Sequence, residues 1–320
     1  MIFWFYISIF LVSCFLLIRS GTWVVQSLTR IAHFLKWKEF IVAFVLMAFA
    51  TSIPEFFIGI ISAWDKIPQL AFGAIVGSNI IKLTLAVSLS ALILGGLKLE
   101  RATVRRNSIF VGIIALLPLF LILDGNLSRI DGVVLLLAFT FYLVWLFDRK
   151  EYFSKIYKPA GEKNENNFGY FFKSIGQFLG SVIILLLGAQ GIIKSSSFFA
   201  EFIGVPLSFI GILLVGAGAA LPEVYFSIRA GKTGHQNMIL GNLMGGVVVT
   251  ATLVLGITAL ISPIEIPDFS PYSLARLFLL ISVLFFLFLS RTESKISKKE
   301  GIILILIYLA FIFFEITNQF

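Results

Sequence analysis

Two short segments of the 320-residue chain carry the same motif inside long apolar runs: ATSIPEF at residues 50–56 and GAALPEV at residues 218–224. Each segment places a glutamate directly after a proline, and the two glutamates, Glu55 and Glu223, lie 168 residues apart. The same shift superposes further identical pairs without a gap: Gly73 on Gly241, Gly77 on Gly245 and Thr84 on Thr252. The chain therefore contains an internal repeat, with residues 20–93 equivalent to residues 188–261.

The composition indicates that lipid is the main solvent of this repeat. The chain is 59% hydrophobic and 13% charged, whereas soluble domains carry about 25% charged residues. Backbone groups facing lipid must be satisfied within the chain, and long apolar runs favour helices over the alternating pattern of a barrel. The composition excludes a soluble enzyme, a nucleic-acid-binding module and a disordered chain. The net charge of +8 is explained by basic cytoplasmic loops rather than by a nucleic-acid partner.

Ten segments approach the length of about 20 mainly apolar residues that a membrane span requires. We therefore predict an all-α membrane protein of about ten transmembrane helices, with the lipid bilayer as its partner. The predicted spans are residues 3–29, 40–63, 70–96, 107–123, 130–147, 175–199, 206–229, 238–262, 272–290 and 301–318.

The hydrophilic stretch 148–173 divides these spans into two groups of five. We predict a first five-helix repeat over 1–147, whose α-repeat covers about 40–93. A second would follow over 174–320, with its α-repeat at about 208–261. An odd number of spans per half gives the halves opposite orientations, which is the inverted-repeat design of secondary transporters. Most Lys and Arg residues follow the odd-numbered spans, so we expect both termini outside and the 148–173 loop in the cytoplasm.

Three charged side chains fall in the middle of predicted spans: Glu55, Lys82 and Glu223. Each costs about 3 kcal/mol or more at a helix centre, so an intramembrane carboxylate indicates function by default. Pro54 and Pro222 lack a backbone donor and are predicted helix breakers beside these carboxylates. The alternative is that both glutamates only cap backbone groups that the prolines set free.

The motifs at residues 50–55 with 73–80, and at residues 218–223 with 241–245, resemble the two α-repeats of the cation/Ca²⁺ exchanger superfamily. Prokaryotic Na⁺/Ca²⁺ exchangers are the most similar in appearance. The resemblance implies alternating-access antiport of Na⁺ against Ca²⁺ in a prokaryotic plasma membrane. It also implies an oxygen-rich midplane site, of the kind that hard cations require. The residues matched to that site are Glu55, Glu223, Thr51, Ser52 and Ser78, with Asn79 nearby.

The sequence departs from the family pattern at five positions. Ala219 and Ala220 replace hydroxyl residues, Gly246 replaces a serine, and Lys82 and Thr250 replace Asn or Asp ligands. Lys82 has three interpretations: a tethered cation paired with Glu55 or Glu223, a proton carrier, or a side chain that points away and snorkels.

We therefore expect a secondary-active cation antiporter that needs no cofactor. Its substrates would be Ca²⁺ or another divalent cation, with Na⁺ or H⁺ as the coupling ion. Thr250 and Lys82 would change ion selectivity or coupling. The alternative is a degenerate homologue that does not transport and acts as a membrane interaction or regulatory protein. An intramembrane enzyme has little support, because no nucleophile–base pair is visible. Whether the protein is a monomer or a homodimer stays open.

Overall fold

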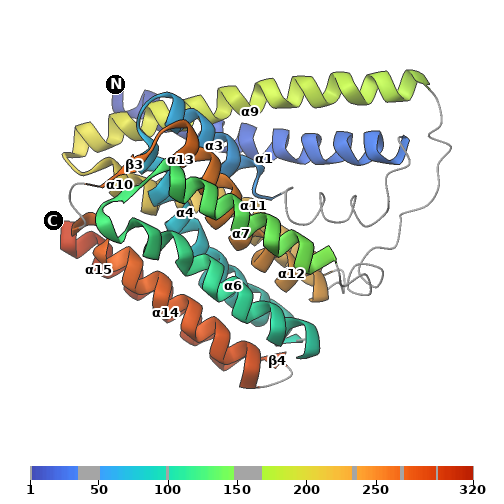
Figure 1. Ribbon diagram of the computed structural model, residues 1–320, viewed down its shortest axis with the longest axis vertical. Helices are drawn as coiled ribbons and strands as arrows, with labels where there is room; N and C mark the ends of the chain where they lie inside the picture. Colours follow the sequence, from blue (N-terminus) through green and yellow to red (C-terminus); the bar gives the residue numbers. More distant parts are fainter. Residues whose placement is uncertain are drawn as a thin grey trace.

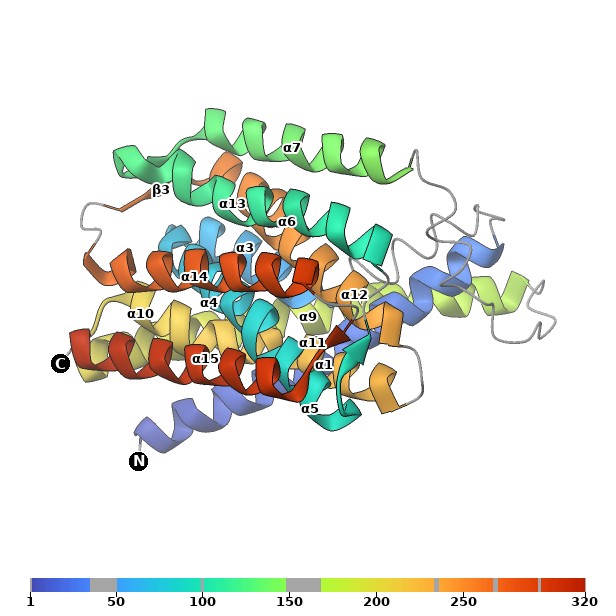
Figure 2. The same ribbon diagram turned by 90° about the horizontal axis from the view of Figure 1, so that it is seen from below.

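The computed structural model is a bundle of long helices (Figure 1). Both termini lie at the same end of the molecule in the two views of Figures 1 and 2, as an even number of spans requires. Parts of the predicted 40–63 span and most of the predicted 148–173 loop lie outside the described residues. The structure describes residues 2–34, 51–98, 101–147, 168–232, 236–266, 270–292 and 295–319.

The helices of the first repeat follow the predicted spans closely. The bundle includes a π-helical turn, η2, and a 3₁₀ turn, η3. The elements are α1 (Ile2–Phe34), α3 (Ile53–Trp64), α4 (Pro68–Ile81), η2 (Lys82–Ala86), α5 (Val87–Leu94), α6 (Arg101–Leu121), η3 (Ile122–Asp124) and α7 (Arg129–Phe147).

The second repeat begins with a 36-residue helix that starts at Phe168, so residues 168–173 of the predicted loop are helical. Two further π-helical turns, η4 and η5, interrupt later helices. The elements are α9 (Phe168–Ile203), α10 (Leu207–Ile210), η4 (Gly211–Val215), α11 (Gly216–Lys232), α12 (Gln236–Val248), η5 (Val249–Val254), α13 (Leu255–Ile261), α14 (Ser270–Thr292) and α15 (Lys298–Gln319).

Eight helical stretches within the described ranges are long and apolar enough to cross a membrane. The stretches Pro68–Leu94 and Ile239–Ile261 are 94% and 78% buried, whereas the terminal stretches Ile2–Val24 and Lys298–Gln319 are each only 22% buried. The two equivalent inner stretches therefore form the centre of the bundle. The terminal ones present most of their surface to lipid, and α1 packs along α9 at one side (Figure 1).

The centre of both inner stretches is distorted in the same way. A π-helical turn begins at Lys82 in the first repeat and at Val249 in the second, so the 168-residue shift overlays η2 on η5. π-helical turns inside α-helices are rare and often mark functional positions. The repeat is therefore structural as well as sequential, and its irregular turns lie near the centres of the two inner stretches.

Two short antiparallel ladders fasten the repeats to each other. β1 (Leu97–Lys98) pairs with β4 (Lys295–Ile296), and β2 (Asn126–Leu127) pairs with β3 (Ile264–Glu265). Each ladder joins one strand of each half. A capping serine directly follows β2 in the first half and β4 in the second half. Ser128 and Ser297 cap α7 and α15 through reciprocal bonds with Asp131 and Glu300.

Glycines let the first repeat's α4 cross the second repeat closely. A Cβ on Gly73 would lie 2.7 Å from the Ser208 carbonyl oxygen, and one on Gly77 would overlap the Ile212 carbonyl. From the opposite helix, a Cβ on Gly211 would lie 2.7 Å from the Leu70 carbonyl oxygen. Small residues of this kind permit backbones to approach within a membrane. α4 consequently lies inside the bundle, among α3, α10 and α14 (Figure 2).

The prediction that Pro222 breaks its helix is wrong, because α11 continues through it from Gly216 to Lys232. Pro222 cannot donate to the carbonyl of Gly218, yet a single missing bond does not end a helix packed on α4 and α12. The preceding irregularity is the π-helical turn η4. Pro54 lies in the first turn of α3, which begins at Ile53, and residues 35–50 lie outside the described residues.

Candidate functional site

Lys82 joins the two repeat glutamates at the centre of the bundle. Its Nζ lies 2.9 Å from Oε1 of Glu55 and 3.2 Å from Oε1 of Glu223, and it donates a hydrogen bond to Glu55. All three side chains are fully buried. The lysine therefore faces the predicted ion site, and the interpretation that it points away and snorkels is wrong.

Each charged side chain comes from a different helical element. Glu55 lies in the first turn of α3, where the positive end of the helix dipole favours a carboxylate. Glu223 follows Pro222 inside α11, and Lys82 begins the π-helical turn η2. From the start of this turn, the Lys82 side chain reaches Glu55 on α3 and Glu223 on α11.

Several oxygens around the lysine have no hydrogen-bond partner among the described residues. They are Oε2 of Glu55, the hydroxyl of Ser52 and both carboxylate oxygens of Glu223, all of them buried; Oε1 of Glu223 nevertheless faces the Lys82 ammonium at 3.2 Å. Buried polar atoms are nearly always partnered by protein or water. Unpartnered carboxylate and hydroxyl oxygens beside a charge cluster therefore form a set of acceptors suited to a cation.

Gly246 opens space on one side of the charge cluster. A Cβ at this position would lie 3.5 Å from Ser52 Oγ, 3.7 Å from Lys82 Nζ and 3.8 Å from Glu223 Oε1. These are ordinary van der Waals distances, so the position faces the cluster without being crowded. The missing serine hydroxyl would have pointed here, and its absence leaves room of about one methyl group.

The remaining predicted hydroxyl ligands are engaged elsewhere. Thr250 Oγ1 donates to Asn79 Oδ1 at 2.8 Å, and Thr51 Oγ1 lies 3.3 Å from Asn242 Oδ1. Ser78 donates to the carbonyl of Ile75 in its own helix, at 3.2 Å. The structure thus brings together Glu55, Glu223, Lys82 and Ser52, while Thr51, Ser78 and Thr250 have other partners.

Asn242 is a site neighbour that the motif analysis did not identify. Asn242 is 1% exposed, and its Oδ1 accepts a hydrogen bond from the Thr51 hydroxyl of the other repeat. Its Nδ2 has no partner within the described part of the chain. The available signal was an amide inside the apolar span 238–262. Asn79 and Thr250 form the corresponding cross-repeat contact, so two polar pairs flank the charged cluster.

The cluster contains fewer acidic groups than a typical divalent site. Among the described residues, no three His, Cys, Asp or Glu side chains come together in a group able to hold a metal ion. Two carboxylates and one ammonium give a formal charge of −1 when all three are ionised. The arrangement can therefore attract a cation, but with half the formal charge of the carboxylate pair alone.

The chain is similar to known proteins in both sequence and structure. The profile of a family described as "Sodium/calcium exchanger protein" matches residues 5–147 and 173–317. The sodium/calcium exchanger MaX1 of Methanosarcina acetivorans is 27% identical, over 95% of this chain and 96% of that protein. The inner membrane protein YrbG of Escherichia coli is 23% identical, over 93% of this chain and 92% of its own length.

Solved structures of the sodium–calcium exchanger NCX_Mj share the fold. The structure soaked with 100 mM Na⁺ and 10 mM Sr²⁺ has a TM-score of 0.64 and 26% sequence identity. The match covers 96% of this chain and 97% of that one. The inverted-repeat, all-helical membrane architecture predicted from the sequence is therefore confirmed.

Proposed function

Because the chain belongs to the sodium/calcium exchanger family, we propose that it is a secondary-active cation antiporter whose ion site is built on Glu55 and Glu223. One observation carries this proposal: the glutamates of the two Pro-Glu motifs, one from each repeat, are both buried and both contact the Lys82 ammonium. Lys82 is near the centre of the span Pro68–Leu94, and Thr250 is near the centre of Ile239–Ile261. Inverted-repeat transporters bind substrate at such a midplane position, where the repeats meet.

Lys82 alters the electrostatics of this site, and we infer that it alters ion selectivity. A unit charge pair about 4 Å apart contributes about 4 kcal/mol at an effective dielectric constant near 20. Since 1.4 kcal/mol corresponds to a tenfold change in affinity, repulsion from one ammonium is enough to remove ordinary Ca²⁺ binding. The geometry supports the interpretation of Lys82 as a tethered cation paired with both glutamates. Its role as a proton carrier stays a second hypothesis for the same residue.

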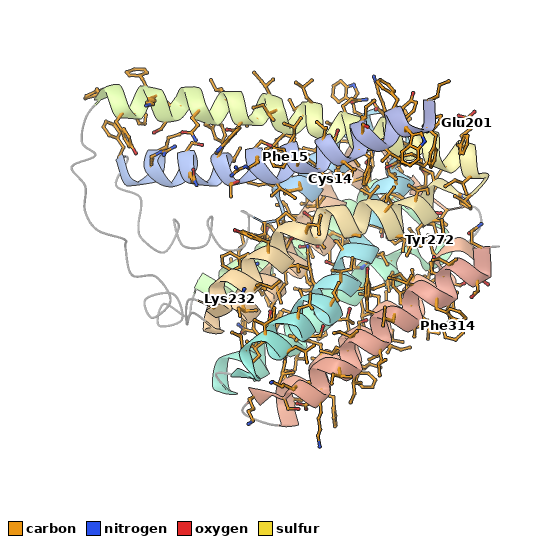
Figure 3. The ribbon with its side chains drawn as sticks, turned by 180° about the vertical axis from the view of Figure 1, so that it is seen from behind. Cys14, Phe15, Glu201, Lys232, Tyr272 and Phe314 are labelled. Carbon is orange, nitrogen blue, oxygen red and sulfur yellow. The ribbon has the colours of Figure 1, made fainter. Side chains whose placement is uncertain are left out.

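Flux measurements in proteoliposomes test the antiporter proposal. We expect uptake of a labelled cation, driven by a Na⁺ or proton gradient, to fall to background in Glu55→Gln and in Glu223→Gln. Glu201→Gln is the matched control, because Glu201 is exposed near the end of α9 (Figure 3), an element that contributes no side chain to the cluster. Unchanged flux in both site variants, with the protein folded, would contradict the proposal.

A non-transporting homologue is the second candidate, and one observation favours it. Three of the predicted hydroxyl ligands bond to protein groups, and the lysine already pairs with both carboxylates. Such a closed network suits a structural ion pair in a membrane interaction or regulatory protein. Absence of flux under gradients of Na⁺, K⁺, Ca²⁺, Mg²⁺, Mn²⁺ and pH would support this candidate over the antiporter.

A further inference from the structure

The free oxygens beside Lys82 limit the kind of cation that the site can accept. We propose that the cluster binds a single monovalent cation of the Na⁺ class, beside Lys82 rather than in its place. This inference rests on the proposed function, because it specifies the substrate class of the same site. The acceptors are the unpartnered oxygens Glu55 Oε2, Glu223 Oε2 and Ser52 Oγ.

The net charge of the buried cluster favours a monovalent cation. Glu55, Glu223 and Lys82 are each at most 1% exposed, so their charges must be balanced within the protein. Two carboxylates and one ammonium leave one negative charge. A monovalent cation brings the cluster to neutrality, whereas a divalent cation would leave a positive charge buried beside an ammonium. Burial of an uncompensated charge is strongly unfavourable.

The number of oxygen atoms available around Lys82 also favours a monovalent cation. Ca²⁺ binds six to eight oxygens, while Oε1 of Glu55 and Oε1 of Glu223 already face the lysine nitrogen. Thr51 and Thr250 are occupied by the two asparagines, Asn242 and Asn79. Among the described side chains around the lysine, three oxygens therefore neither accept a hydrogen bond nor face the ammonium, fewer than the six to eight that Ca²⁺ binds.

The Ser52 hydroxyl lies beside the charge cluster and is suited to bind a cation. Ser52 is 1% exposed, and its hydroxyl has no partner among the described residues and shares the Gly246 corner with Glu223 Oε1 and Lys82 Nζ. Ser62, also buried in α3, bonds to the carbonyl of Gly59 instead. Among the hydroxyls of the described residues, Ser52 is therefore one that has no partner and lies at the Gly246 corner of the cluster, available to an ion.

A transport consequence follows from neutrality. If the loaded site is neutral and the empty site carries one negative charge, the loaded form crosses the low-dielectric interior more readily than the empty one. Exchange of one monovalent cation for another then moves no net charge. The proposal thus predicts electroneutral one-for-one exchange and no competition from Ca²⁺.

Equilibrium binding to the purified full-length protein tests this inference directly. With ²²Na⁺ as the probe, we expect one ion bound per chain, and with ⁴⁵Ca²⁺ we expect no saturable binding. We expect Ser52→Ala to weaken Na⁺ binding about tenfold, since a hydrogen-bonding group facing a charge is lost. Ser62→Ala is the matched control and should bind Na⁺ as the wild type does. Size-exclusion chromatography confirms that each variant is folded.

Three results would overturn the inference: more than one Na⁺ per chain, saturable ⁴⁵Ca²⁺ binding to the wild type, or no Na⁺ binding by the folded wild type. These failures are separate from failure of the antiporter proposal. If the wild type binds and transports Ca²⁺ through Glu55 and Glu223, the antiporter stands and the monovalent site does not. If one Na⁺ binds but no gradient drives flux, the monovalent site stands and the antiporter does not.

Discussion

The Nζ atom of Lys82, in the first repeat, lies 3.2 Å from Oε1 of Glu223, in the second repeat. The same nitrogen lies 2.9 Å from Oε1 of Glu55, so one ammonium links the halves of the molecule through both repeat carboxylates. Removing one member of a buried ion pair leaves an uncompensated charge, while removing both members does not. Because of this asymmetry, the interaction free energy between Lys82 and Glu223 can be measured by comparing single and double variants.

A double-mutant cycle on this pair should show strong coupling. We expect Lys82→Met to lower the free energy of unfolding by about 3–5 kcal/mol, because it leaves two carboxylates buried side by side. Lys82→Met combined with Glu223→Gln should lose less than the sum of the single effects, with a coupling of about 0.5–3 kcal/mol. Denaturant titration in detergent provides the measurement. Additive effects would show that the two charges do not interact.

Lys232 offers the control for this cycle. It is an exposed lysine at the end of α11, remote from the cluster. Lys232→Met should change the free energy of unfolding by no more than about 0.5 kcal/mol, as is usual for surface substitutions. A loss in this control equal to that of Lys82→Met would point to a general effect of removing lysine charge.

The glycines of the repeat motif should differ sharply in their tolerance of a methyl group. Gly77→Ala places a Cβ against the carbonyl of Ile212, where backbone must move, so we expect a loss of about 1–3 kcal/mol or more. Gly246→Ala places a Cβ at 3.5 Å or more from every neighbouring atom and should fold normally. Thermal unfolding in detergent compares the two. Equal melting temperatures would contradict the close crossing of α4 and η4.

The hydrogen bond from Thr250 to Asn79 should support both stability and transport. Thr250→Val removes the donor to a buried amide oxygen, with an expected loss of about 1–3 kcal/mol. Thr252→Val is the control two residues further along, since its hydroxyl donates to the carbonyl of Val248 within the same helical stretch rather than to the other repeat. We expect flux in proteoliposomes to fall more for Thr250→Val than for Thr252→Val. The reverse order would show that the cross-repeat bond has no transport role.

Residue labelling can test the predicted orientation of the protein in its membrane. Glu201 and Lys232 lie at opposite ends of the molecule (Figure 3) and both are exposed, whereas Cys14 is buried. The distribution of basic residues puts Lys232 in the cytoplasm. A membrane-impermeant maleimide should label Glu201→Cys in intact cells, and should label Lys232→Cys only after lysis. Labelling of Lys232→Cys alone in intact cells would reverse the topology.

The sequence was informative wherever one-dimensional spacing determines structure. Apolar run length predicts the spans, and the 168-residue repeat alone identifies Glu55 and Glu223 as equivalent positions. The same alignment placed Lys82 opposite Thr250, and the structure confirms that Lys82 reaches the carboxylates. These features depend on the position of a residue along its helix, and that position follows directly from the hydropathy pattern and from the identical residues of the two repeats.

Features set by side-chain direction and backbone irregularity were not predictable in the same way. Nothing in the spacing showed that Thr51 and Thr250 turn toward asparagines of the opposite repeat, leaving Ser52 free. The π-helical turns shift the helical register, and no simple residue pattern predicts them. Pro222 shows a further limit, because packing on neighbouring helices overrides a local preference to end the helix.

Lys82 lies between the two glutamates of the proposed ion site, and we propose that it excludes divalent cations from that site. The most direct measurement is ⁴⁵Ca²⁺ uptake by Na⁺-loaded proteoliposomes containing either the wild type or Lys82→Asn. We predict uptake near background for the wild type and at least about tenfold greater uptake for Lys82→Asn, since an ammonium repulsion worth several kcal/mol is removed. Equal Ca²⁺ uptake by the two proteins would contradict the account, because Lys82 would then have no part in ion selection.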